Sequence, residues 1–109
     1  MLDEKSCIPC KGGIPPLDKE KAEKLLTEVD KWSLLDENTK IRRNYAFDNF
    51  VDAQAFVNKV GDLCESEFHH ADITFGWGYC TVIFYSHKIG GLHENDFTMA
   101  AKCDGAYAA

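Results

Sequence analysis

The chain has 109 residues, a length that can bury one hydrophobic core and leaves little surplus for a second domain. With 45% hydrophobic and 28% charged residues it has the composition of a folded globule and not of a disordered chain. A net charge of −6 disfavours direct binding to nucleic acid, and the only basic cluster, Lys40 with Arg42 and Arg43, is interpreted as a solvated strand edge.

Neither membrane insertion nor export is indicated by the sequence. No apolar run is long enough to span a bilayer, and the first six residues lack the basic region and apolar segment of a signal peptide. We therefore expect a cytoplasmic protein with no membrane partner. In that reducing compartment the five cysteines, an odd number, are expected to be thiols and not a disulfide framework.

Residues 1–16 predict an extended N-terminal arm, followed by a single domain at residues 17–109. All three prolines of the chain and an adjacent Gly-Gly pair lie within residues 9–16. Cys7 and Cys10 form a CxxC motif, which is half of a zinc site or a redox motif. No second ligand pair follows at similar spacing, and Pro9 discourages the helix that a redox CxxC opens. An unmodified arm is the favoured interpretation, and a metal or redox role is the alternative.

The first elements after the arm are a helix and a hairpin. The helix is expected from Asp18, a good N-cap, to Val29, because apolar residues recur on one helical face. Strands at residues 32–35 and 41–47 then flank the turn-rich tetrad at residues 36–39. In the second strand Ile41, Arg43, Tyr45 and Phe47 alternate with Arg42, Asn44 and Ala46, as the two faces of a half-buried strand do.

The main core helix is expected to begin near Asp48 or Asn49 and to end at about Phe68, because eight apolar side chains fall on one stripe. They are Phe50, Ala53, Phe56, Val57, Val60, Leu63, Cys64 and Phe68. A second hairpin follows, with strands at residues 73–75 and 79–86. A last helix begins near Glu94, and Gly105 is expected to weaken its end.

This order of elements predicts an α+β fold, a four-stranded, mostly antiparallel sheet with three helices packed on one face. The strand at residues 79–86 is apolar on both faces, whereas one layer of helices covers only one. We expect the uncovered face to meet another subunit, which gives a homodimer or a homotetramer.

All four histidines of the chain lie between Glu65 and Asp96. His69 and His70 end the core helix, His87 follows a strand, and Asp96 lies in the first turn of the last helix, so three element ends could converge on one pocket. Glu65 and His69 are four residues apart and are expected to share one helix face, where the carboxylate and the helix C-terminus favour a protonated imidazole. Asp96, at the positive end of a helix dipole, is suited to accept hydrogen bonds or to orient a histidine, as His87 would require.

Each residue of this set also has a plainer interpretation. His69 and His70 could be polar surface at a helix end, and His87 could satisfy a buried strand end. Asp96 alone is more often a helix-start stabiliser than a catalytic group. His93, near the expected N-cap of the last helix, is the weakest candidate. The ordered set is much more specific than any single member.

In this set the sequence resembles the pterin-4a-carbinolamine dehydratases. Their pattern is a Glu four residues before His-His-Pro, then Thr/Ser-His, then Gly-Leu and an acidic residue that opens a helix. The matching residues are Glu65, His69, His70, Ser86, His87, Gly91, Leu92 and Asp96. The stretches at residues 7–13 and 76–79 resemble bacterial members, so the similarity spans nearly the whole chain. Ala71 and His93 depart from the family, which usually has Pro and Ser or Thr at these positions.

The resemblance implies a lyase, a 4a-hydroxytetrahydrobiopterin dehydratase that forms quinonoid dihydropterin and water and supports the cofactor of aromatic amino acid hydroxylases. The reaction delivers a proton to the departing C4a hydroxyl and removes one from N5. His69 and His87 would move protons around the hydroxyl, His70 would contact the pterin or make the second transfer, and Asp96 would tune His87. The implied catalytic residues are His69, His70, His87 and Asp96, and the implied substrate-binding residues are Glu65, His69, His70, Ser86 and His87. No metal or organic cofactor is expected, since proton transfers suffice.

Two other classes of function stay open. The same fold could serve as a non-catalytic binding or regulatory module, since animal members of the family that the sequence resembles also assist a homeodomain transcription factor. The histidine-rich site could also hold zinc or iron, although adjacent histidines need not point to one centre.

Overall fold

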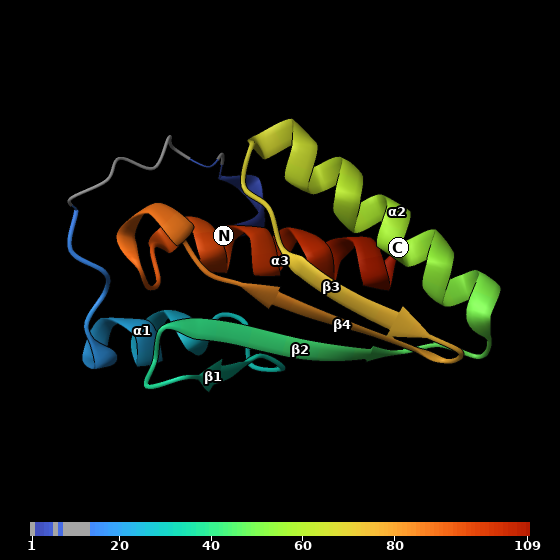
Figure 1. Cartoon of the computed structure of the whole chain (residues 1–109), viewed down its shortest axis with the longest axis horizontal. Coiled ribbons are helices and arrows are strands. Elements are labelled where there is room, and N and C mark those ends of the chain that lie inside the picture. Colours follow the sequence, from blue (N-terminus) through green and yellow to red (C-terminus); the bar gives the residue numbers. More distant parts are fainter. Residues whose placement is uncertain (1, 6, 8–13) are drawn as a thin grey trace.

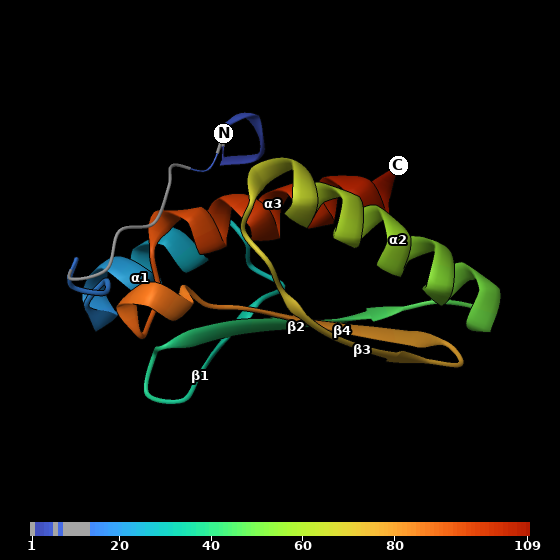
Figure 2. The ribbon, with the colours of Figure 1, turned by 45° about the horizontal axis from the view of Figure 1, so that its top comes forward.

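Four antiparallel strands and three helices make up the computed structural model of the chain, which describes residues 2–5, 7 and 14–109 (Figure 1). The elements are a 3₁₀ turn η1 (Leu2–Glu4), α1 (Lys19–Leu26), β1 (Ser33–Leu35), β2 (Lys40–Ala46), α2 (Phe50–Glu67), β3 (Asp72–Gly76), β4 (Tyr79–Phe84), a 3₁₀ turn η2 (His87–Ile89) and α3 (Glu94–Ala108). The sheet has the order β1-β2-β4-β3. Figure 2 shows the three helices on one side of it, which confirms the predicted α+β fold.

The helix boundaries follow from the capping residues. Asp18 accepts a hydrogen bond from the Lys21 backbone N–H at 2.9 Å and begins α1, as predicted. This helix ends at Leu26 and not at Val29, because the chain continues in turns, and the Val29 side chain is still buried. Asn49 caps α2 by accepting from the Asp52 N–H at 2.8 Å.

Helix α2 contributes the central stripe of the core. Ala53, Phe56, Val60 and Cys64 are buried, as the helical spacing predicts. Phe50 and Phe68 do not belong to the buried stripe, and that part of the prediction is wrong. The Phe50 side chain is 43% exposed. Phe68 is the C-cap of α2, with a left-handed φ of 53°, and its side chain is 85% exposed. The chain therefore leaves the helical path one residue before the histidine pair.

A carboxylate at Asp104 ties α3 to the sheet. It accepts from Trp32 Nε1 at 3.0 Å, Arg43 Nη1 at 2.7 Å and the Tyr45 hydroxyl at 2.6 Å. Burial, with this hydrogen bond, raises the pKa of Tyr45 far above its ordinary value. Arg43 is only 16% exposed, so the interpretation of its basic cluster as solvated is wrong for this residue.

Gly105 does not end α3, which continues to Ala108. Tyr107 anchors this last turn, because its ring packs against Tyr45, Phe47 and Phe56 at centroid distances of 4.8, 5.4 and 5.7 Å. Its hydroxyl also donates to the Ala46 carbonyl at 2.8 Å. This packing offsets the roughly 1 kcal/mol that a glycine costs within a helix.

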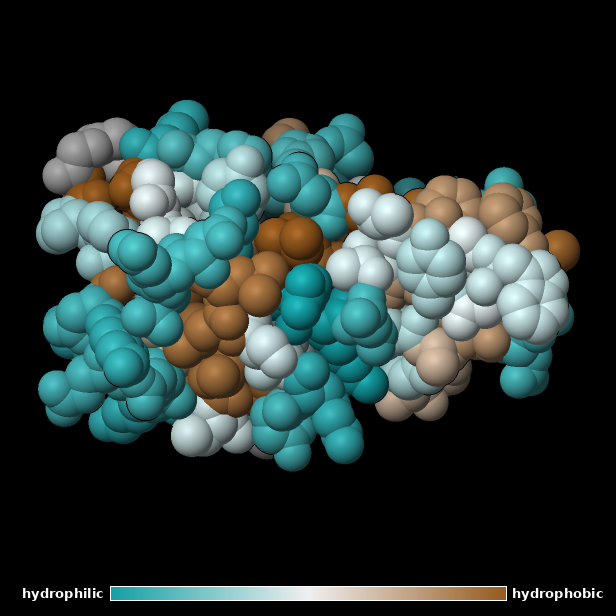
Figure 3. Space-filling view, turned by 60° about the horizontal axis from the view of Figure 1, so that its bottom comes forward, coloured by the Kyte–Doolittle hydropathy of each residue, from teal (hydrophilic) through white to brown (hydrophobic). Residues whose placement is uncertain are grey.

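The two faces of the sheet differ in cover. In β4 the side chains of Cys80, Val82 and Phe84 are buried beneath the helices, while Ile83 lies on the outer face opposite Arg42. Figure 3 shows this outer side of the molecule, where apolar side chains gather at the centre between hydrophilic ones. The expected two-sided apolar pattern is therefore present.

The described part of the N-terminal arm lies along α3. Leu2 is buried, and Lys5 forms an ion pair with Glu94 at 2.7 Å. The Cys7 backbone N–H donates to Glu67 at 2.7 Å, while Cys10 lies outside the described residues. Residues 2–4 form a 3₁₀ turn, and the division between arm and domain stays a prediction. None of the helices in the described ranges is long and apolar enough to cross a membrane.

Candidate active site

A buried imidazole–carboxylate pair joins the end of α2 to the start of α3. His69 Nε2 lies 2.6 Å from Asp96 Oδ1, and the two side chains are 8% and 0% exposed. The other carboxylate oxygen accepts from the Ser86 hydroxyl and from the His93 backbone N–H, both at 2.9 Å. Asp96 therefore accepts three hydrogen bonds, which fix the plane of its carboxylate.

Local backbone geometry sets this pair in place. The left-handed Phe68 turns the chain at the end of α2, and the His69 N–H bonds back to the Cys64 carbonyl at 3.1 Å. The His69 ring stacks near Phe84 of β4 at 6.2 Å, with an interplanar angle of 18°. Thus α2 and β4 both position this imidazole.

On the α3 side, His93 is the N-cap, as its place in the sequence predicts. Its Nδ1 accepts from the Asn95 N–H at 3.0 Å. The Asp96 carboxylate in turn accepts a hydrogen bond from the His93 N–H, so the two residues form a capping box. The carboxylate is thus both a helix-start stabiliser and the partner of His69, and the two interpretations of Asp96 hold together.

Glu65 pairs with His70 and not with His69, so the expected pairing is wrong. Glu65 Oε2 is hydrogen-bonded to His70 Nε2, and both side chains are exposed. Spacing by four residues brings side chains together only inside a helix. Because Phe68 leaves the helix, His69 turns inward to Asp96 and His70 turns toward Glu65.

His87 is not the partner of Asp96, and this expectation is also wrong. It opens the short turn η2, is exposed, and contacts the Tyr85 ring at a centroid distance of 4.0 Å. The loop that carries it is closed by the Ser86 N–H bonding the Gly91 carbonyl at 2.8 Å. Gly91 is required there, since an added Cβ would lie 2.6 Å from Pro16.

One cleft of about 180 Å³ joins most of the candidate residues. It is lined by Phe68, His69, His70, Tyr85, Ser86, His87 and Lys88. Three of the four histidines therefore share it. Glu65 and Asp96 do not line the cleft, and they contact the imidazoles of His70 and His69 that do. Tyr85 and Lys88 were missed by the sequence analysis. Their positions beside the Ser-His pair are the signal that could have found them.

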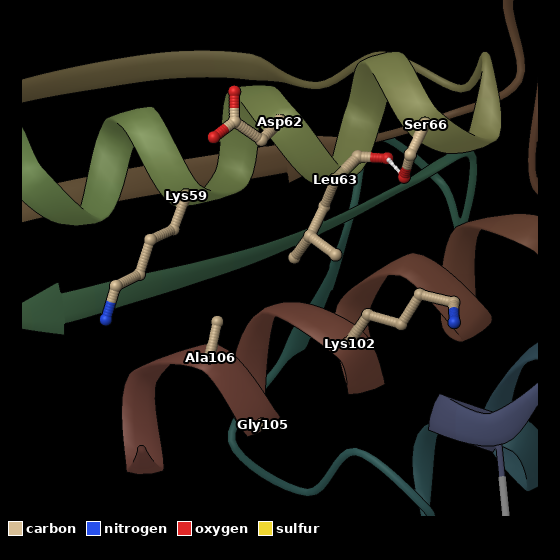
Figure 4. Close-up of a pocket in the computed structure, with 7 residues that line it drawn as sticks. All are labelled: Lys59, Asp62, Leu63, Ser66, Lys102, Gly105 and Ala106. Atoms are coloured by element: carbon tan, nitrogen blue, oxygen red, sulfur yellow. Dashed lines mark hydrogen bonds between the residues drawn. The ribbon is translucent and has the colours of Figure 1, made fainter.

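A larger hollow of about 630 Å³ lies between α2 and α3 (Figure 4). Lys59 and Lys102 extend from the two helices, and Leu63 points into the space between them. None of the residues that line it is a histidine. Proton transfer near neutral pH is therefore better served by the smaller cleft.

The cysteines of the described residues are thiols, as predicted for Cys7, Cys64, Cys80 and Cys103. Burial raises the pKa of Cys80 to about 11, and it also raises the pKa values of the other two core thiols. These groups are therefore unsuited to act as nucleophiles. Within residues 2–5, 7 and 14–109, no group of three or more His, Cys, Asp or Glu side chains is placed to hold a metal ion.

Comparison with known proteins identifies the family. Residues 15–106 match the family model described as pterin 4 alpha carbinolamine dehydratase. The chain belongs to this family. A "Putative pterin-4-alpha-carbinolamine dehydratase" of Methylococcus capsulatus is 60% identical over 94% of the chain and 90% of that protein. A protein of the same name from Halorhodospira halophila is 50% identical over 94% of both chains.

Two solved structures, of a pterin dehydratase and a pterin dehydratase-like protein, share the fold. The crystal structure of a transcriptional coactivator/pterin dehydratase from Brucella melitensis superposes with a TM-score of 0.79 and 26% identity, covering 86% of this chain and 99% of that one. A pterin dehydratase-like protein identified as a RuBisCO assembly factor in the alpha-carboxysome gives a TM-score of 0.63 at 20% identity, covering 72% and 92%. At that identity the second likeness concerns the fold alone.

Proposed function

We propose that this member of the pterin carbinolamine dehydratase family dehydrates 4a-hydroxytetrahydropterin to quinonoid dihydropterin and water, through acid–base catalysis by the cleft histidines. The observation that carries the proposal is the buried His69–Asp96 pair opening onto a cleft shared with His70 and His87. The names of the Methylococcus and Halorhodospira relatives support the same reaction.

His69 is the proposed proton donor. An ionised carboxylate only accepts hydrogen bonds, so the contact with Asp96 places a hydrogen on Nε2 and leaves Nδ1 as the ring nitrogen available to a ligand. The nearby negative charge stabilises the imidazolium that forms when Nδ1 also carries a proton. His69 then delivers that proton to the C4a hydroxyl.

The electron pairs balance without an oxidant or a reductant. As the C4a–O bond breaks, the hydroxyl leaves as water with the proton from the imidazolium. The N5–H electron pair becomes the second bond between N5 and C4a, and the N5 proton passes to a base. In our proposal His87 shares the proton transfers around the hydroxyl, and His70, held by Glu65, contacts the pterin or receives the N5 proton.

The test is a dehydration assay on 4a-hydroxytetrahydropterin with single and double variants. His69→Ala and His87→Ala should each slow turnover by roughly a hundredfold, the scale of one acid–base group. The double variant should lose less than the product of the two, because the groups act on one step. His93→Ser, which removes an imidazole but keeps a capping side chain, is the matched control and should retain parental turnover. Parental turnover in folded, pterin-binding His87→Ala would contradict the role of His87.

A chelator should leave the rate unchanged, since the proposed steps are proton transfers between imidazoles and substrate. Loss of activity on chelation, restored by zinc, would instead support the metalloenzyme alternative.

A binding or regulatory module of the same fold is the second candidate, favoured by the name of the Brucella protein, a transcriptional coactivator/pterin dehydratase. The same assay separates the two, because a folded parent chain that binds pterin but does not turn it over fits only the module.

The proposed partners are the pterin substrate, a second copy of the chain and, functionally, an aromatic amino acid hydroxylase in the cytoplasm. The apolar side chains on the outer face of β4, away from the helices, motivate the homodimer or homotetramer. Residues 17–109 are the proposed single domain of each copy. Light scattering at micromolar concentration tests this, and a monomer alone would contradict it.

A further inference from the structure

His87 differs from the other two cleft histidines in what holds its imidazole. His69 and His70 each have a carboxylate bonded to Nε2. Among the residues that the structure describes, His87 has no hydrogen bond or ion pair to its ring, and its ring contact is with Tyr85. An exposed side chain on a short turn samples several rotamers unless something restricts it. Tyr85 is therefore the side chain placed to restrict the His87 imidazole.

Tyr85 is itself held in place. It directly follows β4, lines the cleft, and its ring centroid lies 4.7 Å from the Lys40 ammonium. Lys40 is anchored in turn by Asp36, with the two charged groups 3.4 Å apart. A cation against an aromatic ring is attracted by the ring's quadrupole, so β2 steadies the ring that His87 contacts.

We propose that Tyr85 is a positioning residue that holds the His87 imidazole at the mouth of the cleft, with Lys40 supporting Tyr85. This inference rests on the proposed dehydration, in which His87 moves a proton. Tyr85 and His87 lie at 4.0 Å with their planes at 39°, an offset aromatic contact. Such pairs are worth roughly a three- to tenfold change in an equilibrium. We expect the same loss in kcat without the ring, with KM little changed, because proton transfer is a transition-state interaction.

Three variants separate positioning from simple packing. Tyr85→Leu should lower kcat about three- to tenfold, and Tyr85→Phe, which keeps the ring, should restore it. Tyr79→Leu is the matched control, since Tyr79 lies on the same outer face of β4 at the far end of the strand and should retain the parental kcat. In a His87→Ala background, Tyr85→Leu should cause no further loss, because the ring acts through His87.

A second readout does not depend on turnover. In proton NMR the His87 ring signals should be shifted by the tyrosine ring in the parent and in Tyr85→Phe, and should move toward free-imidazole values in Tyr85→Leu. An equal loss of kcat in the presence and absence of His87, or unchanged His87 ring signals in Tyr85→Leu, would overturn the proposal. If the parent shows no turnover, the proposed function fails, and these ring signals alone decide whether Tyr85 holds His87.

Discussion

Replacing Asp96 by Asn should expose how much the cleft depends on one carboxylate. The parent side chain accepts three hydrogen bonds, from His69 Nε2, the Ser86 hydroxyl and the His93 N–H. An amide offers one oxygen and one NH₂ group. With its NH₂ toward His69, the amide opposes the Nε2–H of an imidazolium. In the other orientation the NH₂ opposes the N–H of His93. Either orientation loses a bond that the carboxylate makes.

The sizes of the expected losses in stability and turnover follow from the geometry of the His69–Asp96 pair. Loss of the charge-assisted bond at 2.6 Å, in a fully buried group, should reduce the free energy of unfolding by about 1.5–3 kcal/mol. Turnover should fall by up to roughly a hundredfold, the loss expected for removal of His69 itself, because His69 can no longer hold its second proton where the departing hydroxyl needs it. That loss corresponds to about 2.7 kcal/mol in the activation barrier.

The assay compares kcat and thermal unfolding of Asp96→Asn with those of Asp104→Asn. Asp104 lies about two turns further along α3 and also accepts three donors, but it faces the sheet and not the cleft. Both variants should lose stability, and only Asp96→Asn should lose turnover. Parental turnover in a folded Asp96→Asn variant, or an equal kinetic loss in Asp104→Asn, would refute the reasoning.

Four further predictions concern residues outside the catalytic set. Burial and a carboxylate partner raise the pKa of Tyr45, so the folded state keeps a proton that the unfolded chain releases above about pH 10. Tyr45 should therefore make the free energy of unfolding measured in urea fall as pH rises above 10, by up to about 1.4 kcal/mol per pH unit, and Tyr45→Phe should remove this contribution while that of the buried thiols of Cys64, Cys80 and Cys103 remains. His93→Ala should cost about 1 kcal/mol of stability through loss of the N-cap, whereas His93→Ser should not; equal melting temperatures for the two would contradict the cap. Ala71→Pro should leave turnover equal or higher, because proline stiffens the loop after the histidine pair, and a large loss would show that this loop follows a different path. The double variant Cys7→Ser, Cys10→Ser should keep its turnover, and loss of most activity with the fold intact would reveal a role for the arm thiols.

The sequence predicted the fold well where one local signal dominated. Asp18 and Asn49 begin helices because their side chains cap free N–H groups. The middle of the α2 stripe is buried because its spacing matches the helical period, at Ala53, Phe56, Val60 and Cys64. Gly105 shows where a local signal fails to predict a helix end, since the long-range packing of Tyr107 keeps α3 intact beyond this glycine. Local propensity is a weak guide where tertiary contacts act on the same residue.

The histidines of the cleft were also predictable, but their pairings were not. Three histidines do share one cleft. The left-handed turn at Phe68 breaks the helical spacing, so Glu65 meets His70. Asp96 meets His69 across 27 residues through the packing of α2 against α3, which no local pattern encodes. A side chain's partner is decided by the backbone path on both sides of the contact.

The most direct test of the proposed site is the response of the four histidines to pterin, followed by NMR of their ring protons. A stable reduced pterin that lacks the 4a hydroxyl is titrated into the protein, and each signal is assigned by single substitution. The rings of His69, His70 and His87 line the cleft and should shift together with one dissociation constant. The ring of His93 caps α3, and its signals serve as an internal control that should not shift. A shift confined to His93, or saturable binding that leaves all three cleft histidines unchanged, would contradict the assignment of this cleft as the pterin site.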